Sequence, residues 1–235
     1  DITVQNGSLA TMTSSDNITW TGTFTPTSGV EDSENVLTLA TTYTDTAGNS
    51  PASTSATDNY TVDTTAATVV AFTLSDSALK IGDTATVTLQ FSEAVASFSS
   101  SADITVENGS LATMTTTDNI TWTGTFTPSS DVEDAENVMT LAASYTDTAG
   151  NAGPSATTAN YQVDTVRPTV AAFTMSDTAL KIDDTATVTL QFSEAVANFS
   201  SSADITVQNG SLSTMTTANN ITWTSTFTPS SDVED

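Results

Sequence analysis

The stretch Asn17-Ile-Thr-Trp-Thr-Gly-Thr-Phe-Thr-Pro26 decides the fold, because it has the alternation of a half-buried β-strand. Ile18, Trp20 and Phe24 are expected on one side, and threonines alternate with them on the other. Proline ends the run because it cannot donate a hydrogen bond to a neighbouring strand. The Thr-x-Thr rows also suggest an ice-binding array, but the solvent face of a strand explains them better, since threonine is favoured there.

The same strand recurs at 119–128 and 220–229, so the chain is built from repeats. The motif Asp1-Ile-Thr-Val-Gln-Asn-Gly-Ser also recurs, 102 and then 101 residues further on, with one Gln-to-Glu change. A period of about 100 residues matches one domain rather than a solenoid unit. The repeats predict three segments: the C-terminal part of one domain at 1–62, a whole domain at 63–163, and the N-terminal part of another at 164–235.

The whole repeat contains about seven short strand-like runs separated by turns, and it contains no amphipathic helix of note. This pattern predicts an all-β fold, with tandem immunoglobulin-like sandwiches of two sheets. The polar segment Ser75–Asp83 and the acidic segment Val30–Asn35 are expected as loops. Strands are expected over 69–74, 84–91, 103–106, around Met114, and over 119–126, 138–145 and 160–163.

The charge is strongly acidic, with 3 basic residues against 28 acidic ones and a net charge of −25. Such a surface argues against nucleic acid and anionic membranes as partners, and cations are the expected counter-charges. The chain has no cysteine and no histidine, which excludes disulfides and the usual zinc ligands. No signal peptide or membrane-spanning run is present, so export and anchoring are expected to be encoded elsewhere.

Alternating strand directions would bring acidic loops together at the two ends of the whole repeat. Asp63, Glu93, Asp147 and Asn151 are expected at the end that carries the incoming joint. Ca²⁺ accepts six to eight oxygen ligands in irregular geometry, which suits loops better than the tighter octahedron of Mg²⁺ does. Any one of these side chains alone is better explained as a solvated charge, but the set predicts calcium. A second cation site at the far end would use Asp76, Asp83, Asp131, Glu133, Asp134 and Glu136, together with Asp164 at the next joint.

Three motifs carry a resemblance to a known family. They are Val-Asp-Thr-x-x-x-Thr-Val at 62–69, Phe-Ser-Glu-Ala-Val at 91–95 and Tyr-Thr-Asp-Thr-Ala-Gly-Asn at 145–151. In this order they resemble the bacterial immunoglobulin-like extender repeats of giant calcium-dependent adhesins of the RTX type. The resemblance implies type I secretion to a Gram-negative cell surface and calcium at the joints. It also implies that Asp164 with Glu194, and Asp45 with Asn49, are ligands at neighbouring joints.

The joints of that family usually contain Thr-Ala-Pro, and this chain departs from the pattern. It has Thr65-Ala66-Ala67 at the first joint and Val166-Arg167-Pro168 at the second. The first joint lacks the proline that restricts the backbone, and it is therefore expected to bend more.

These features favour a monomeric spacer that touches neighbouring repeats of its own chain, while other domains bind the distal ligand. The alternative is an immunoglobulin-like module that itself binds a glycan or a protein, which would need an exposed aromatic patch specific to one repeat. An enzyme is the weakest interpretation. The acidic clusters could be compared with a glycosidase pair, but no cleft accompanies them.

Overall fold

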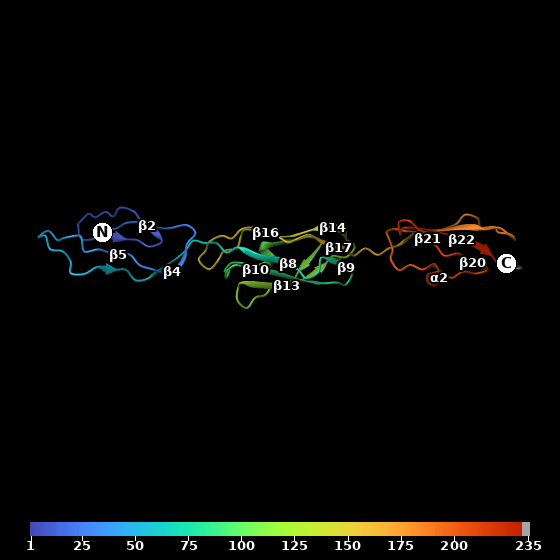
Figure 1. Cartoon of the computed structure of the whole chain (residues 1–235), viewed down its shortest axis with the longest axis horizontal. Helices are drawn as coiled ribbons and strands as arrows, with labels where there is room; N and C mark the ends of the chain where they lie inside the picture. Colours follow the sequence, from blue (N-terminus) through green and yellow to red (C-terminus); the bar gives the residue numbers. More distant parts are fainter. Residues whose placement is uncertain (232–235) are drawn as a thin grey trace. The chain divides into compact units, whose positions relative to one another are not determined.

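The structure is a computed structural model that describes residues 1–231 (Figure 1). The last four residues of the predicted repeat 164–235 lie outside the described residues. Contacts divide the chain into two units, Asp1–Thr165 and Val166–Asp235. The helices α1 (Ser100–Asp103) and α2 (Ser201–Asp204) are single turns. No helix in the described part of the chain is long and apolar enough to cross a membrane.

The first sheet of the whole repeat has the order β12-β13-β10-β8, and all its pairs are antiparallel. Alternation in β10 places Val87, Leu89 and Phe91 inward, each at most 1% exposed. Thr86 and Thr88 lie on the outer face, opposite threonines of β13. The bounds are β8 (Val69–Leu74), β10 (Ala85–Phe91), β12 (Gly109–Leu111) and β13 (Thr121–Pro128).

The second layer consists of two three-stranded sheets, ordered β11-β15-β16 and β14-β17-β9. Its inward residues complete the core between the layers, and the rings of Phe126 and Tyr161 meet edge to face with centroids 5.2 Å apart. The predicted all-β, immunoglobulin-like sandwich is thereby confirmed. The bounds are β9 (Ala78–Lys80), β11 (Ile104–Val106), β14 (Glu133–Asn137), β15 (Met139–Leu141), β16 (Ala156–Thr157) and β17 (Tyr161–Asp164).

Two segments expected as loops are strands instead. The acidic segment Val30–Asn35 contains β4 (Glu31–Asn35), and its counterpart in the whole repeat is β14. The polar turn Ser75–Asp83 contains β9, which runs parallel to β17. In the whole repeat, β9 and β14 are edge strands that flank β17, so they need a main-chain partner but no apolar face, and charged residues are common at such edges. Beside Met114 the structure has an isolated bridge, between Thr115 and Thr123, and the strand before it is β12. The strand expected over 138–145 ends at Leu141.

Residues 1–63 form the corresponding second layer together with one antiparallel pair, β2 with β3, that corresponds to β12 with β13. The sheets are β1-β5-β6, β4-β7 and β2-β3. Of the stretch Asn17–Pro26, only Phe24–Pro26 is a strand, and Ile18 and Trp20 are 85% and 52% exposed, contrary to expectation. In the whole repeat this strand pairs with β10, and residues 1–63 contain no counterpart of β10. The bounds are β1 (Ile2–Thr3), β2 (Gly7–Leu9), β3 (Phe24–Pro26), β4 (Glu31–Asn35), β5 (Thr38–Leu39), β6 (Ser55–Ala56) and β7 (Tyr60–Asp63).

The unit Val166–Asp235 keeps the first sheet of the repeat, in the order β18-β19-β22-β20, with β21 paired to β22. A small core contains Val188, Leu190 and Met215. The bounds are β18 (Val170–Met175), β19 (Ala186–Phe192), β20 (Gly210–Leu212), β21 (Thr216–Thr217) and β22 (Thr222–Pro229).

Candidate cation site at the first joint

Thr64 fastens the joint to the preceding repeat. Its hydroxyl donates to the carbonyl of Thr27 at 2.7 Å and accepts from the backbone N–H of Val30 at 3.0 Å. The backbone N–H of Thr64 also donates to the carbonyl of Val30, at 2.8 Å. Thr165 makes the same contacts at the end of the whole repeat, where it is 5% exposed. The threonine after each joint aspartate is therefore a structural anchor.

The following repeat holds the joint through Ser92. The Thr68 N–H donates to the Ser92 hydroxyl at 2.9 Å, and the Ser92 N–H donates to the Thr68 carbonyl at 2.8 Å. Ala67 is fully buried in the core of that repeat. Thr65 and Ala66 are thus the residues left between the two anchor points, so the joint is short and tightly held on both sides.

Three carboxylates converge beside this joint. One oxygen from each of Asp63, Glu93 and Asp147 lies within 4.8 Å of the others. Asp63 ends β7, Glu93 follows β10, and Asp147 begins the loop that leads toward β16. Asp147 is fully buried, whereas the other two are half-buried. In the described part of the chain, no other set of three acidic side chains meets this criterion.

The loop Asp147–Asn151 is organised around the Asp147 carboxylate. One oxygen accepts the backbone N–H groups of Ala149 and Asn151, both at 2.9 Å, and Gly150 adopts a φ of +96° that favours glycine. The Asn151 side-chain amide donates to the other Asp147 oxygen at 2.8 Å. It also donates to the carbonyl of Asp63 at 3.2 Å, so it links the loop to the joint.

The pKa values of Glu93 and Asp147 are shifted in opposite directions. Burial raises the pKa of Glu93, and the nearby charges of Asp63, Asp147 and Glu31 raise it further. Burial also opposes ionisation of Asp147, but the hydrogen bonds from the Asn151 side chain and from its own loop lower the pKa of Asp147 overall. The site therefore keeps one carboxylate ionised by local donors and leaves another under repulsion that a cation would relieve.

Sequence reasoning missed Glu31. It lies directly opposite Asp63 in the antiparallel ladder of β4 and β7, so both side chains project from the same face. Its charge also acts on Glu93. The available signal was the recurrence of Val-Glu-Asp at 30–32 and 132–134.

Most of the other predicted joint ligands have the same local contacts as their counterparts at the first joint. Asp45 accepts from the backbone N–H and the side-chain amide of Asn49, at 2.8 Å and 2.9 Å, and these bonds lower the pKa of Asp45. Asp164 lies opposite Glu133 in its own unit, as Asp63 lies opposite Glu31. Glu194 is half-buried in the unit Val166–Asp235. These pairs remain predictions.

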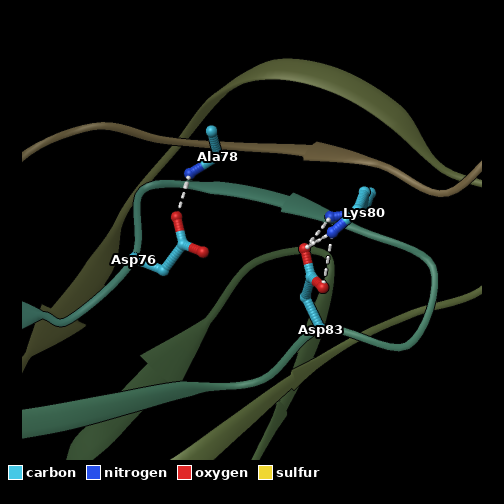
Figure 2. Close-up of polar contacts among 4 residues, drawn as sticks. All are labelled: Asp76, Ala78, Lys80 and Asp83. Carbon is cyan, nitrogen blue, oxygen red and sulfur yellow. Dashed lines mark hydrogen bonds and ion pairs between the residues drawn. The ribbon is translucent and has the colours of Figure 1, made fainter.

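The second predicted set does not gather as a group of three ligand atoms among the described residues. Lys80 donates to both oxygens of Asp83 at 2.8 Å, and Asp76 accepts the N–H of Ala78 (Figure 2). Asp134 accepts from the Asn108 amide at 2.8 Å. Those oxygens already have protein donors. The remaining members, Asp131, Glu133 and Glu136, lie on or beside the edge strand β14.

Comparison with protein families gives a match that covers every repeat. The model of the bacterial Ig-like domain matches residues 1–62, 63–163 and 164–235. Comparisons with curated proteins and with solved structures gave no match. Together with the two-layer β architecture, the family match means that this chain belongs to the bacterial Ig-like domain family.

Proposed function

We propose that this chain is a structural spacer of a large bacterial surface adhesin, in which Ca²⁺ at the joint stiffens the connection between successive repeats. Tandem repeats of a bacterial Ig-like domain support the spacer role. The observation that carries the calcium part is the convergence of Asp63, Glu93 and Asp147 within 4.8 Å. Secretion to the Gram-negative cell surface belongs to the same proposal, because domains of this family often occur in extracellular surface proteins.

The donor set fits a hard cation. Every candidate ligand is an oxygen: three carboxylates, the Asp63 carbonyl and the Asn151 amide oxygen. Ca²⁺ prefers such ligands and tolerates their irregular arrangement, and extracellular calcium modules commonly bind with dissociation constants of about 10⁻⁴–10⁻³ M. A bound calcium ion would neutralise most of the negative charge of the three carboxylates. The Asn151 amide would then turn its oxygen inward, since its N–H groups now face the acids.

The mechanical consequence follows from where the ligands originate. Asp63 belongs to the joint and to β7 of the preceding repeat, whereas Glu93 and Asp147 belong to the following repeat. The two anchors, Thr64 and Ser92, already leave only a short connection. Cross-linking the joint to the next repeat through shared ligands would restrict the remaining bending, and the absence of proline at Ala67 makes this contribution larger at the first joint.

The alternative, a module that binds a glycan or a protein, lacks a supporting surface in the whole repeat. The exposed large hydrophobic residues among described residues 63–163 are Val70 and Ile81, and neither is aromatic. The exposed face of the first sheet carries mainly threonine. Spacers need repetition rather than a unique patch, which agrees with the near-identity of the repeats.

The test measures calcium-dependent stability and extension of the full chain. Calorimetry and small-angle scattering would compare wild type, Asp63→Asn and the matched control Asp58→Asn, in Ca²⁺, in Mg²⁺ and in EGTA. We expect Ca²⁺ to raise the melting temperature and the stiffness of wild type and of the control, and to have little effect on Asp63→Asn. Equal melting temperatures and scattering profiles of wild type in Ca²⁺ and EGTA would overturn the proposal.

A further inference from the structure

The whole repeat contains two triplets of the form Asn-x-Ser/Thr, which is the acceptor pattern for N-linked glycosylation. Asn108-Gly-Ser110 leads into β12, and Asn119-Ile-Thr121 lies in the turn that leads into β13. Both triplets recur at the same places in the other two repeats. The asparagine amide nitrogen accepts the sugar, and the hydroxyl two residues later completes the pattern. A triplet is therefore usable only where the protein does not already engage these groups.

The amide of Asn108 is engaged by the fold. Its nitrogen donates to Asp134 Oδ2 at 2.8 Å and to Asn137 Oδ1 at 2.6 Å. Asn137 is 1% exposed, so loss of the second bond would leave a buried oxygen without a donor. Asn6 makes the same two contacts in the preceding repeat, both at 2.7 Å. The first triplet therefore has a structural role that modification would disrupt.

The amide of Asn119 is exposed, and other groups hold its turn together. The Thr116 hydroxyl accepts the backbone N–H of Asn119 at 2.9 Å. Asp118 Oδ1 accepts the backbone N–H groups of Ile120 and Thr121, both at 2.9 Å. The side chains of Asn119 and Thr121 make no hydrogen bond within the described part of the chain. Both groups of the second triplet are thus available to another molecule.

A role in the turn accounts for the backbone of Asn119 but not for the triplet. Its φ of +59° is met by asparagine and more readily by glycine. The side chains that cap the turn vary between the repeats, whereas the segment Asn-Ile-Thr-Trp-Thr that follows them is identical in all three. The varying caps are Ser14, Thr116 and Thr217 at one position and Asp16, Asp118 and Asn219 at the other.

We propose that Asn119 is a glycosylation site, to which a transferase adds a sugar that is activated at C1 by a diphosphate. The amide nitrogen attacks C1 and gives one proton to a base of the transferase. The C1–O bond breaks, and the diphosphate leaves with its electron pair. Asn17 and Asn220 occupy the same turn in the other repeats and are acceptors too. The Asn119 carbonyl accepts the N–H of Val95 at 3.0 Å, so the glycan would lie at the end of the repeat that carries Glu93.

The first experiment maps modified residues by mass spectrometry of the full chain, isolated from the cells that produce it. Asn119 should carry a sugar, and Asn108 should carry none because its amide is engaged. Asn108 is a matched control, since it belongs to the same repeat and to the same kind of triplet. An unmodified Asn119, or equal modification of Asn108, would overturn the proposal.

Variants made in the same cells test the role of the hydroxyl. Thr121→Val should abolish modification of Asn119 and leave Asn17 and Asn220 modified, whereas Thr121→Ser should keep it. Thr123→Val, on the same face of β13, is the control and should be modified as wild type is. Melting curves would show that each variant remains folded. Modification of Asn119 that persists in Thr121→Val would overturn the proposal.

A third experiment identifies the source of the activated sugar. The full chain, made in a host without such a transferase, is incubated with two fractions of the producing cells. One arm combines the cytosolic fraction with labelled uridine diphosphate hexose, and the other uses membranes that hold sugars linked to lipid diphosphate. Transfer to Asn119 in either arm supports the proposal and names the donor. Transfer in neither arm would overturn it.

Discussion

Replacing Glu93 by Gln should stabilise this protein in the absence of calcium and weaken its response to calcium. The substitution keeps the shape of the side chain and removes one charge from the cluster at the joint. Glu93 repels both Asp63 and Asp147, with oxygens no more than 4.8 Å apart. Two unit charges at that separation repel by about 0.9 kcal/mol in bulk water and by about 3.5 kcal/mol at an effective dielectric constant of 20. Because the site is half-buried, each pair falls between these limits.

In EGTA, Glu93→Gln should therefore be more stable than wild type, by about 2 kcal/mol or more when both pairs are summed. For a domain of this size, the change corresponds to a melting temperature higher by roughly 5–15 °C. In calcium at ten times the dissociation constant, wild type should gain about 1.4 kcal/mol from binding alone. The variant should gain much less, because it has lost a charged ligand. Calcium should therefore narrow or invert the difference in melting temperature between the variant and wild type.

Differential scanning calorimetry at neutral pH measures both effects, with Glu34→Gln as the control. Glu34 is exposed and lies outside the cluster, so its substitution should move neither the melting temperature in EGTA nor the response to calcium. Equal melting temperatures of Glu93→Gln and Glu34→Gln in EGTA would refute the repulsion at Glu93. A calcium response of Glu93→Gln as strong as that of wild type would refute its role as a ligand.

The remaining predictions concern pH and the anchors. In EGTA, the melting temperature of wild type should rise relative to that of Glu93→Gln as pH falls through the raised pKa of Glu93, because protonation ends the repulsion. A pH series of melting curves with the opposite slope would contradict this. At lower pH the stabilisation from Asp147, whose pKa is lowered, should be lost in both proteins. Thr165→Val removes a hydroxyl that donates one hydrogen bond at 2.7 Å and accepts another at 3.0 Å. It should lower the free energy of unfolding, measured in urea, by about 1–3 kcal/mol. Substitution of the exposed Thr157 by Val should change it little. Gly153→Ala would place a Cβ 2.2 Å from the Tyr145 ring and should destabilise by about 1–3 kcal/mol, unlike a substitution on the open surface.

The core strands could be predicted from sequence because their signal is local. Alternation of apolar and polar residues over 69–74 matches β8, and the alternation over 84–91 contains all of β10. The joint strand expected at 160–163 matches β17 within one residue. The edge strands β9 and β14 gave no such signal. Their residues are polar or acidic, and what makes them strands is a main-chain partner, β17, that is remote in sequence.

The residues of the candidate site also differ in whether local sequence predicts their position. Asp63, Glu93, Asp147 and Asn151 could be placed together because alternating strand directions bring their loops to one end. Glu31 could not, because its position depends on the register of β4 against β7. The exposure of Trp20 also depends on pairing, since the same residue type is half-buried at Trp122, where β10 is adjacent.

The acids of this chain differ in how their charge is satisfied, and the difference singles out the joint. Asp16 and Asp118 cap their own turns, where backbone N–H groups two and three residues further on lower the pKa of each. Glu93 receives no hydrogen bond within the described part of the chain, and its pKa is raised by burial and by neighbouring acids. The turn acids have hydrogen-bond donors within their own loops, whereas Glu93 lies against two other carboxylates. Its negative charge would therefore be balanced by a cation from outside the chain. A cation bound at the joint would relieve this repulsion, in keeping with the proposed role of calcium in stiffening the connection between repeats.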